Sequence, residues 1–176
     1  AIRINALERA CVEYSTKRSG GAIFSSRKSA RIAVVGGGLS GLTATFDLIT
    51  KGFQVVLFEA GSQLAGRVRQ LGEEKLPQQS IDEDLAMLEN VLVEVRLNTP
   101  IGCDTQTGPS LRAVIDEFDA VYLGVGLAGP ASWGEELALG DGGRIAIEEL
   151  TFATSNPKVF AGGSQRCGFA AYSPIT

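Results

Sequence analysis

Two short apolar runs separated by a helix-like segment dominate the central part of the chain. Residues 32–36 (IAVVG) and 54–59 (QVVLFE) are almost continuously apolar, as expected for strands buried on both faces of a parallel sheet. The segment 39–51 between them has the length of a helix, and Gly52 follows as its stop. This arrangement predicts a parallel strand–helix–strand unit with a right-handed crossover.

The same pattern predicts further elements on both sides of this unit. Apolar positions at helical spacing predict a helix over 3–14, and the polar, Gly/Ser-rich residues 15–30 are typical of a linker. Ser80 is the expected N-cap of a helix over 80–90, with Asp82 to Asp84 in its first turn. The other predicted elements are a short helix over 110–117 and strands over 92–98, 119–126, 144–149 and 158–162.

Together these elements predict an α/β domain of three layers, with a parallel sheet and a small β-rich crossover. The length of 176 residues suits one domain, or one and a half, and apolar residues make up 44% of the chain, enough for a core. We expect residues 1–30 to form an N-terminal helix and linker, and residues 31–176 to form the domain.

Composition narrows the chemistry that the chain can perform. The net charge of −4 gives no reason to expect nucleic-acid binding, although residues 1–31 hold seven Lys/Arg against two Glu. The chain has no histidine and only three widely separated cysteines, which argues against a metal site and against a histidine-assisted nucleophile. An odd cysteine count fits a reducing compartment, so we expect a cytoplasmic protein. No apolar run is long enough to span a membrane.

The stretch VVGGGLSGL (34–42) carries the strongest functional signal. Gly36, Gly38 and Gly41 have the spacing G-x-G-x-x-G between a predicted strand and a predicted helix. In this motif the first glycine allows a tight turn, the second admits a pyrophosphate, and the third allows the helix to pack closely. Glu59, 18 residues after Gly41, is positioned to bind a ribose 2′-hydroxyl, and its charge disfavours NADP. The pattern predicts a dinucleotide site but does not separate FAD from NAD.

A second motif lies near the C-terminus, in TSNPKVFAGGSQRCG (154–168). It resembles the flavin-side motif of two-dinucleotide flavoproteins, Thr-x-x-Pro-x-x-Phe/Tyr-Ala-x-Gly-Asp. Ser164 stands where that motif has aspartate, the residue that bonds the ribityl chain of FAD. A neutral hydroxyl predicts a weaker contact there, or one through water.

A wider resemblance covers nearly the whole chain. The segments INALERACVE, ARIAVVGGGLSGLTATFDL, GFQVVLFEAGSQLAGRVRQ, LENVLVEVRLNTPIG and EFDAVYLGVG resemble, in the same order, the small subunit of NADPH-dependent glutamate synthase and the flavin end of dihydropyrimidine dehydrogenase. The resemblance implies that residues 31–176 bind FAD. The cofactor-binding residues it implies, together with the glycine loop, are Gly36, Gly38, Leu39, Ser40, Gly41, Glu59, Ala60, Gly66, Arg67, Ile101, Gly124, Gly126, Gly163 and Ser164.

Two segments depart from that family. Its Gly-Gly-Leu-Leu is replaced by residues 65–68 (AGRV), and its Gly-Ile-Pro by residues 71–77 (LGEEKLP), in the region that should approach the flavin ring. Arg67 and Arg69 are candidates for a cation beside the pyrophosphate or the flavin, and a surface role fits them equally well.

The family also has parts that this sequence lacks. Its nicotinamide domain is inserted after the strand equivalent to 119–126, whereas here residues 127–143 form a short join without a second glycine loop. Its cysteine-rich iron–sulfur segments are also absent. We therefore expect NAD(P)H to act through a missing domain or a partner subunit of a larger redox complex, which could contain iron–sulfur clusters. No residue is a convincing catalytic acid or base, and Trp133 is expected to cover surface left by the missing domain.

Two alternatives remain open at this point. The segment EAGSQLAGRVRQ (59–70) resembles an amine-oxidase phrase in which Arg67 would lie against the pyrophosphate. The chain could also be a degenerate Rossmann module that serves as a scaffold without flavin, which Ser164 and the absent nicotinamide domain favour.

Overall fold

The computed structural model describes residues 26–89, 93–102, 108–126, 133, 136–140 and 143–163. The predicted helix over 3–14 lies outside these residues, as do most of the predicted linker and Ser164. Five parallel strands form one sheet in the order β3-β2-β1-β4-β5. They are β1 (Arg31–Val35), β2 (Gln54–Phe58), β3 (Val93–Arg96), β4 (Ala120–Leu123) and β5 (Val159–Ala161).

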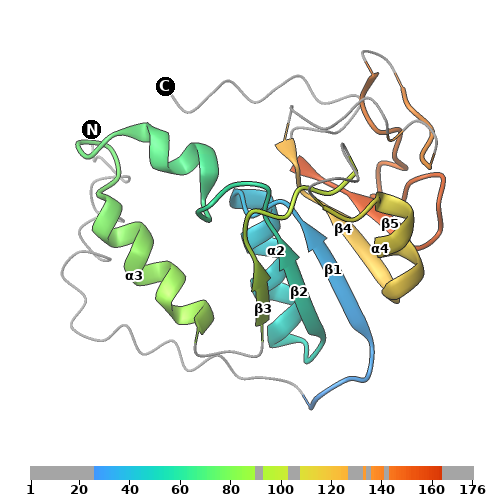
Figure 1. Cartoon of the computed structure of the whole chain (residues 1–176), viewed down its shortest axis with the longest axis horizontal. Coiled ribbons are helices and arrows are strands. Elements are labelled where there is room, and N and C mark those ends of the chain that lie inside the picture. Colours follow the sequence, from blue (N-terminus) through green and yellow to red (C-terminus); the bar gives the residue numbers. More distant parts are fainter. Residues whose placement is uncertain are drawn as a thin grey trace, which may run out of the picture.

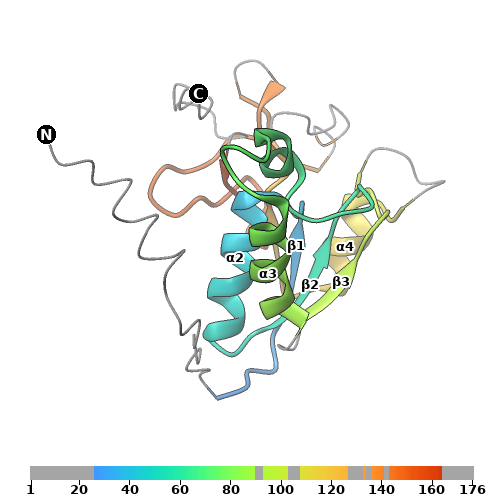
Figure 2. The ribbon, with the colours of Figure 1, turned by 90° about the vertical axis from the view of Figure 1, so that its left-hand side faces the viewer.

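Helices cover both faces of this sheet, as the sequence predicts. Helices α2 (Leu39–Thr50) and α3 (Gln78–Glu89) lie on one face, and α4 (Leu111–Glu117) lies on the other (Figures 1 and 2). A 3₁₀ helix, η1 (Gly66–Leu71), lies in the connection between β2 and α3. The predicted three-layer α/β architecture is therefore confirmed.

The two sheet faces bury separate apolar cores because successive side chains of a strand point to opposite faces. In β1, Val34 packs on the side of α2 and α3, whereas Ala33 and Val35 pack on the side of α4. Strands covered on both faces need continuous apolar sequences, and this requirement explains the runs from which they were predicted.

The start of α3 corrects one prediction. The helix begins at Gln78, so Ser80 lies inside it and is not its N-cap, and the acidic residues from Asp82 lie beyond the first turn. The first amide of the helix is satisfied from outside, because Gln78 N–H donates to the Glu73 carboxylate at 3.2 and 3.3 Å. A serine does cap α4, where the Ser110 hydroxyl accepts a hydrogen bond from Ala113 N–H at 3.1 Å.

The crossover between β4 and β5 differs from its prediction in two respects. Residues 144–149 do not form a strand. In the described part of the crossover, β structure is limited to two isolated antiparallel bridges, one between Leu139 and Ile145 and one from Ala153 to Phe160 of β5. Trp133 does not cover open surface. Its side chain is only 2% exposed and belongs to the core on the α4 face, together with Leu137 and Ile145.

Strands β3 and β5 are the two edges of the described sheet. Strand β3 has four residues and presents charged side chains, with Arg96 Nε donating to Glu94 Oε1 at 2.7 Å. The Arg96 guanidinium also lies 5.2 Å from the centre of the Phe58 ring. Strand β5 has only three residues.

Candidate functional site

The strand order creates a topological switch point at the carboxyl end of β1. The chain runs from β1 to β2 and β3 on one side, and then to β4 and β5 on the other, so the connections diverge between β1 and β4. In open α/β sheets, ligands bind at such a switch point, outside the carboxyl ends of the strands. The predicted G-x-G-x-x-G loop lies here, because Gly36 directly follows β1 and Gly41 lies in the first turn of α2.

Three glycines at this switch point are required by the packing of the protein itself. Gly36 has a φ of +100°, and a Cβ on it would lie 2.6 Å from the carbonyl oxygen of Gly124. A Cβ on Gly41 would lie 1.7 Å from the carbonyl oxygen of Gly36, and one on Gly124 would lie 3.0 Å from Gly41 N. The ends of β1 and β4 and the start of α2 therefore meet backbone to backbone.

Gly38 is different, because the protein leaves the space beside it open. A Cβ added there would meet no atom of the described residues within 4 Å, and its φ of −78° is accessible to any residue. Gly38 is the N-cap of α2, and no side chain caps that helix. The first N–H groups of a helix have no partner within the helix, and they form the positive end of its dipole. The open space thus lies where an anionic group would be bound.

Glu59 is held in place at the end of β2. Its Oε2 accepts a hydrogen bond from Gly37 N–H, and its Oε1 accepts one from Gly61 N–H, both at 2.7 Å. Each carboxylate oxygen can accept a further bond, so a hydroxyl donor can still be bound. The carboxylate therefore joins the glycine loop to the loop after β2 in one fixed geometry.

The loop after β3 is attached to this carboxylate region. Thr99 N–H donates to the carbonyl of Glu59 at 2.8 Å, and Asn98 N–H donates to that of Gly61 at 2.9 Å. Ile101, one of the predicted cofactor-binding residues, follows in the same loop and is buried. Glu59 and Ile101 thus lie on two connected loops.

The segment after β5 reaches the start of α2. The hydroxyls of Ser40 and Tyr122 lie 2.7 Å apart and share a hydrogen bond. A Cβ on Gly162 would lie 2.2 Å from the Tyr122 hydroxyl, and one on Gly163 would lie 3.1 Å from the Ser40 side chain. The tail motif is therefore adjacent to the glycine loop up to Gly163, and Ser164 lies outside the described residues.

The other predicted cofactor-binding residues are mostly exposed and make no described contact with the glycine loop. Ala60, Gly66 and Arg67 are exposed, and Leu39, the first residue of α2, is 62% exposed. Gly126 follows β4 with a φ of +70°, and a Cβ there would meet no atom within 4 Å.

Sequence reasoning missed several residues that build the site. Gly37 donates to Glu59, and its carbonyl accepts a hydrogen bond from Ala65 N–H at 2.8 Å. Tyr122 lies in a predicted buried strand. Its hydroxyl could have indicated a contact near the site, because a phenol on a buried strand needs a hydrogen-bond partner. Arg69 was a candidate for a cation beside the ligand, but its guanidinium donates hydrogen bonds to Leu64, Gln78 and Asp82.

The described residues contain neither a candidate membrane span nor a cluster of metal ligands. No helix in this part of the chain is long and apolar enough to cross a membrane. No group of three or more His, Cys, Asp or Glu side chains in it could hold a metal ion.

The strand order and the glycine loop at the switch point define a Rossmann-like α/β domain. The chain belongs to the pyridine nucleotide-disulphide oxidoreductase family, whose sequence profile matches residues 2–171. The predicted resemblance to dihydropyrimidine dehydrogenase flavoproteins is confirmed by a relative of that kind. The NAD-dependent dihydropyrimidine dehydrogenase subunit PreT of Escherichia coli strain K12 is 31% identical over 99 residues, which are 56% of this chain and 23% of that protein.

Other relatives belong to different redox enzymes. The NADP(+)-dependent formate dehydrogenase subunit beta of Moorella thermoacetica is 29% identical over 99 residues, 55% of this chain and 13% of that protein. An alkyl hydroperoxide reductase component of Staphylococcus epidermidis is 30% identical over 141 residues, 75% of this chain and 25% of that protein. The chain therefore spans about a quarter or less of the length of these curated relatives.

Solved structures align only in part. The 6-hydroxypseudooxynicotine amine oxidase of Pseudomonas geniculata has a TM-score of 0.44 at 28% identity and covers 58% of this chain and 15% of that one. The thioredoxin reductase of Lactococcus lactis has a TM-score of 0.32 at 20% identity and covers 86% of this chain and 48% of that one. The fold assignment rests on the strand order itself.

Proposed function

We propose that residues 31–176 hold FAD as an electron carrier within an NAD(P)H-linked oxidoreductase. The observation that carries this proposal is the contrast among the glycines of the loop. Gly36 and Gly41 are required by neighbouring backbone, whereas the space beside Gly38 is open. Gly38 is therefore not explained by packing, and its position in the motif is the one where the absence of a side chain lets a pyrophosphate approach the backbone.

The residues around this opening fit the parts of a flavin dinucleotide. The start of α2 would hold the pyrophosphate, and Glu59 would accept a hydrogen bond from the adenosine ribose. The loop with Ile101 would meet the adenine, and the segment after β5 would meet the ribityl chain. When bound, FAD would accept and pass on electrons, and the protein would supply position and electrostatics.

The electron donor and acceptor would come from elsewhere. The described crossover holds no second nucleotide loop, so NAD(P)H would act through another domain or a partner subunit. The sequence resemblance to the glutamate synthase small subunit, and the relatives named as subunits of dihydropyrimidine and formate dehydrogenases, support a place in a larger redox complex. The odd cysteine count supports a reducing compartment such as the cytoplasm.

The decisive experiment measures FAD binding by flavin fluorescence and absorbance in the wild-type chain and in Gly38→Val. The branched side chain would occupy the pyrophosphate position, so binding should fall by about a hundredfold or more. The apo protein should keep its fold, because a Cβ at Gly38 meets no atom of the described residues within 4 Å. Ala113→Val, at an exposed position in the first turn of α4, is the matched control and should bind FAD like wild type.

Two results would contradict this proposal. A Gly38→Val protein that stays fully loaded with FAD would mean that the site is wrongly located. A colourless wild-type protein that takes up no added FAD would favour the scaffold without flavin.

A further inference from the structure

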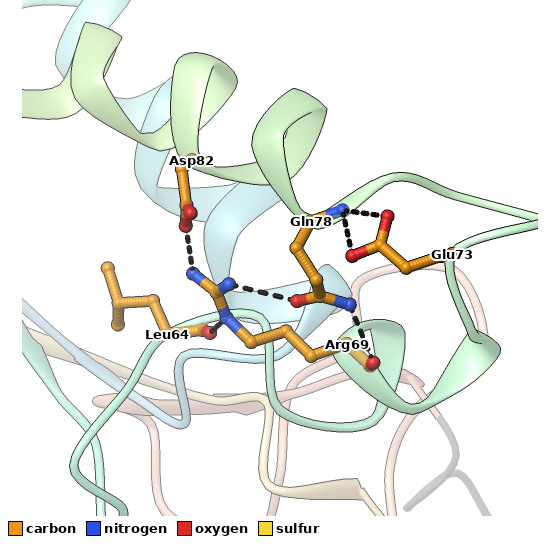
Figure 3. Close-up of polar contacts among 5 residues, drawn as sticks. All are labelled: Leu64, Arg69, Glu73, Gln78 and Asp82. Carbon is orange, nitrogen blue, oxygen red and sulfur yellow. Dashed lines mark hydrogen bonds and ion pairs between the residues drawn. The ribbon is translucent and has the colours of Figure 1, made fainter.

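Arg69 is the centre of a polar network that joins the connection after β2, at Leu64, to the first turns of α3. Figure 3 shows its guanidinium between the carbonyl of Leu64 and the first turns of α3. Arg69 Nε donates to the Leu64 carbonyl oxygen at 2.8 Å, Nη1 to Gln78 Oε1 at 3.2 Å, and Nη2 to Asp82 Oδ1 at 2.7 Å. Gln78 returns a bond from its amide to the Arg69 carbonyl at 2.9 Å.

This network is partly shielded from solvent. The Arg69 side chain is 19% exposed, whereas that of Asp82 is 62% exposed. A planar guanidinium that makes three directed contacts fixes its partners more tightly than a single surface ion pair does. Arg69 therefore ties the chain at Leu64 to α3, a helix that is packed against the sheet through Leu85 and Leu88.

The segment that Arg69 holds contacts the glycine loop directly. Ala65 N–H donates to the Gly37 carbonyl, and the Leu64 side chain lies against Gly37, where an added Cβ would be 2.5 Å from its Cδ2. Ala65 adopts a left-handed φ of +69°, a conformation that the surrounding contacts must maintain. Gly37 is thus clamped at both of its backbone polar groups, since its N–H donates to Glu59 and its carbonyl accepts from Ala65.

We propose that Arg69 is a positioning residue for the dinucleotide site, acting through Leu64 and Ala65 on Gly37. This inference rests on the proposed function but assigns Arg69 a role different from that of a cation bound to the ligand. Three of its five N–H groups already bond the protein and hold the guanidinium toward α3, so the network itself accounts for most of its hydrogen bonding. The clamp instead sets the position of the backbone next to the opening at Gly38.

The test compares Arg69→Gln and Asp82→Asn with two matched controls, Arg112→Gln and Asp116→Asn. Arg112 and Asp116 form an exposed ion pair on α4. We expect Arg69→Gln to weaken FAD binding about tenfold, Asp82→Asn about threefold, and the double variant no more than Arg69→Gln alone. At saturating FAD, Arg69→Gln should also alter the visible circular dichroism of the flavin. The controls should do neither.

A second measurement does not depend on FAD. In the apo protein, amide hydrogen exchange at Gly37 and Ala65 should accelerate about tenfold in Arg69→Gln, and should be unchanged in the control Arg112→Gln. If Arg69→Gln fails to fold, Arg69→Lys, which keeps the charge but loses the fork geometry, replaces it and should show the same direction.

The outcomes separate this inference from the proposed function. Unchanged exchange at Gly37 and Ala65 overturns the positioning role, whatever the wild-type protein binds. Unchanged or tighter FAD binding in Asp82→Asn also overturns it, because releasing Arg69 would then favour a direct contact with the ligand. Absence of FAD binding by the wild type, with accelerated exchange in Arg69→Gln, overturns the proposed function alone and supports the clamp.

Discussion

Single glycines at the carboxyl end of β1 differ in what they do for the molecule. Gly36 and Gly41 allow three backbone segments to touch, so their role would exist without any ligand. Gly38 has no such role in the protein. The same short motif therefore combines residues needed for folding with a residue that we propose is needed for binding, and substitutions can separate the two.

Gly41→Ala is expected to destabilise the protein by about 3 kcal/mol or more, as judged by denaturant unfolding. In a typical helix the same substitution would stabilise by up to about 1 kcal/mol, because alanine favours the helix. Here the added Cβ would lie 1.7 Å from the Gly36 carbonyl oxygen, which is backbone and cannot move aside cheaply. Gly38→Ala is the control and should cost about 1 kcal/mol or less, the usual loss when alanine occupies an N-cap position. Equal effects at the two positions would refute this distinction.

Helix termini show where prediction from sequence reached its limit at the scale of elements. The strands of the sheet were predictable from continuous apolar runs, since burial on both faces requires them. The start of α3 was not, because its first amide is bonded by Glu73, a residue five positions earlier in an irregular loop. Residues 144–149 alternate like a strand but make only one isolated bridge at Ile145, since no neighbouring strand runs beside them in the described chain.

Ser110→Ala should lower the free energy of unfolding by about 1 kcal/mol, because the Ser110 hydroxyl caps α4. Ser80→Ala should change it by less than about 0.5 kcal/mol, because Ser80 lies inside α3 rather than at its start. Urea denaturation followed by far-UV circular dichroism measures both values. A larger loss at Ser80 than at Ser110 would restore the capping role predicted from sequence.

At the scale of the whole molecule, the motif spacing predicts where the candidate site lies, whereas the contacts that build it could not be predicted. The motif spacing identified Gly36, Gly38, Gly41 and Glu59, all of which lie at one end of the sheet. The clamp on Gly37 depends on contacts between residues distant in sequence, which no local pattern encodes. The burial of Trp133 likewise depends on how the crossover folds against the α4 face.

Trp133 is the only tryptophan, so its fluorescence reports on the crossover alone. We expect a short-wavelength emission maximum in the folded protein that shifts to the red on unfolding, because the ring is buried among apolar side chains. This transition should coincide with loss of circular dichroism, since crossover and sheet share one core. A separate, earlier fluorescence transition would mean that the crossover unfolds independently.

The borders of the sheet also bear on how the protein behaves at high concentration. A long, flat, apolar border strand invites a second molecule to extend the sheet, which is a common route to insoluble assemblies. Here one border is three residues long, and the other carries Glu94 and Arg96 side by side. Addition of a neighbouring chain there would strip water from both charges, so the fold resists growth by strand addition at these borders.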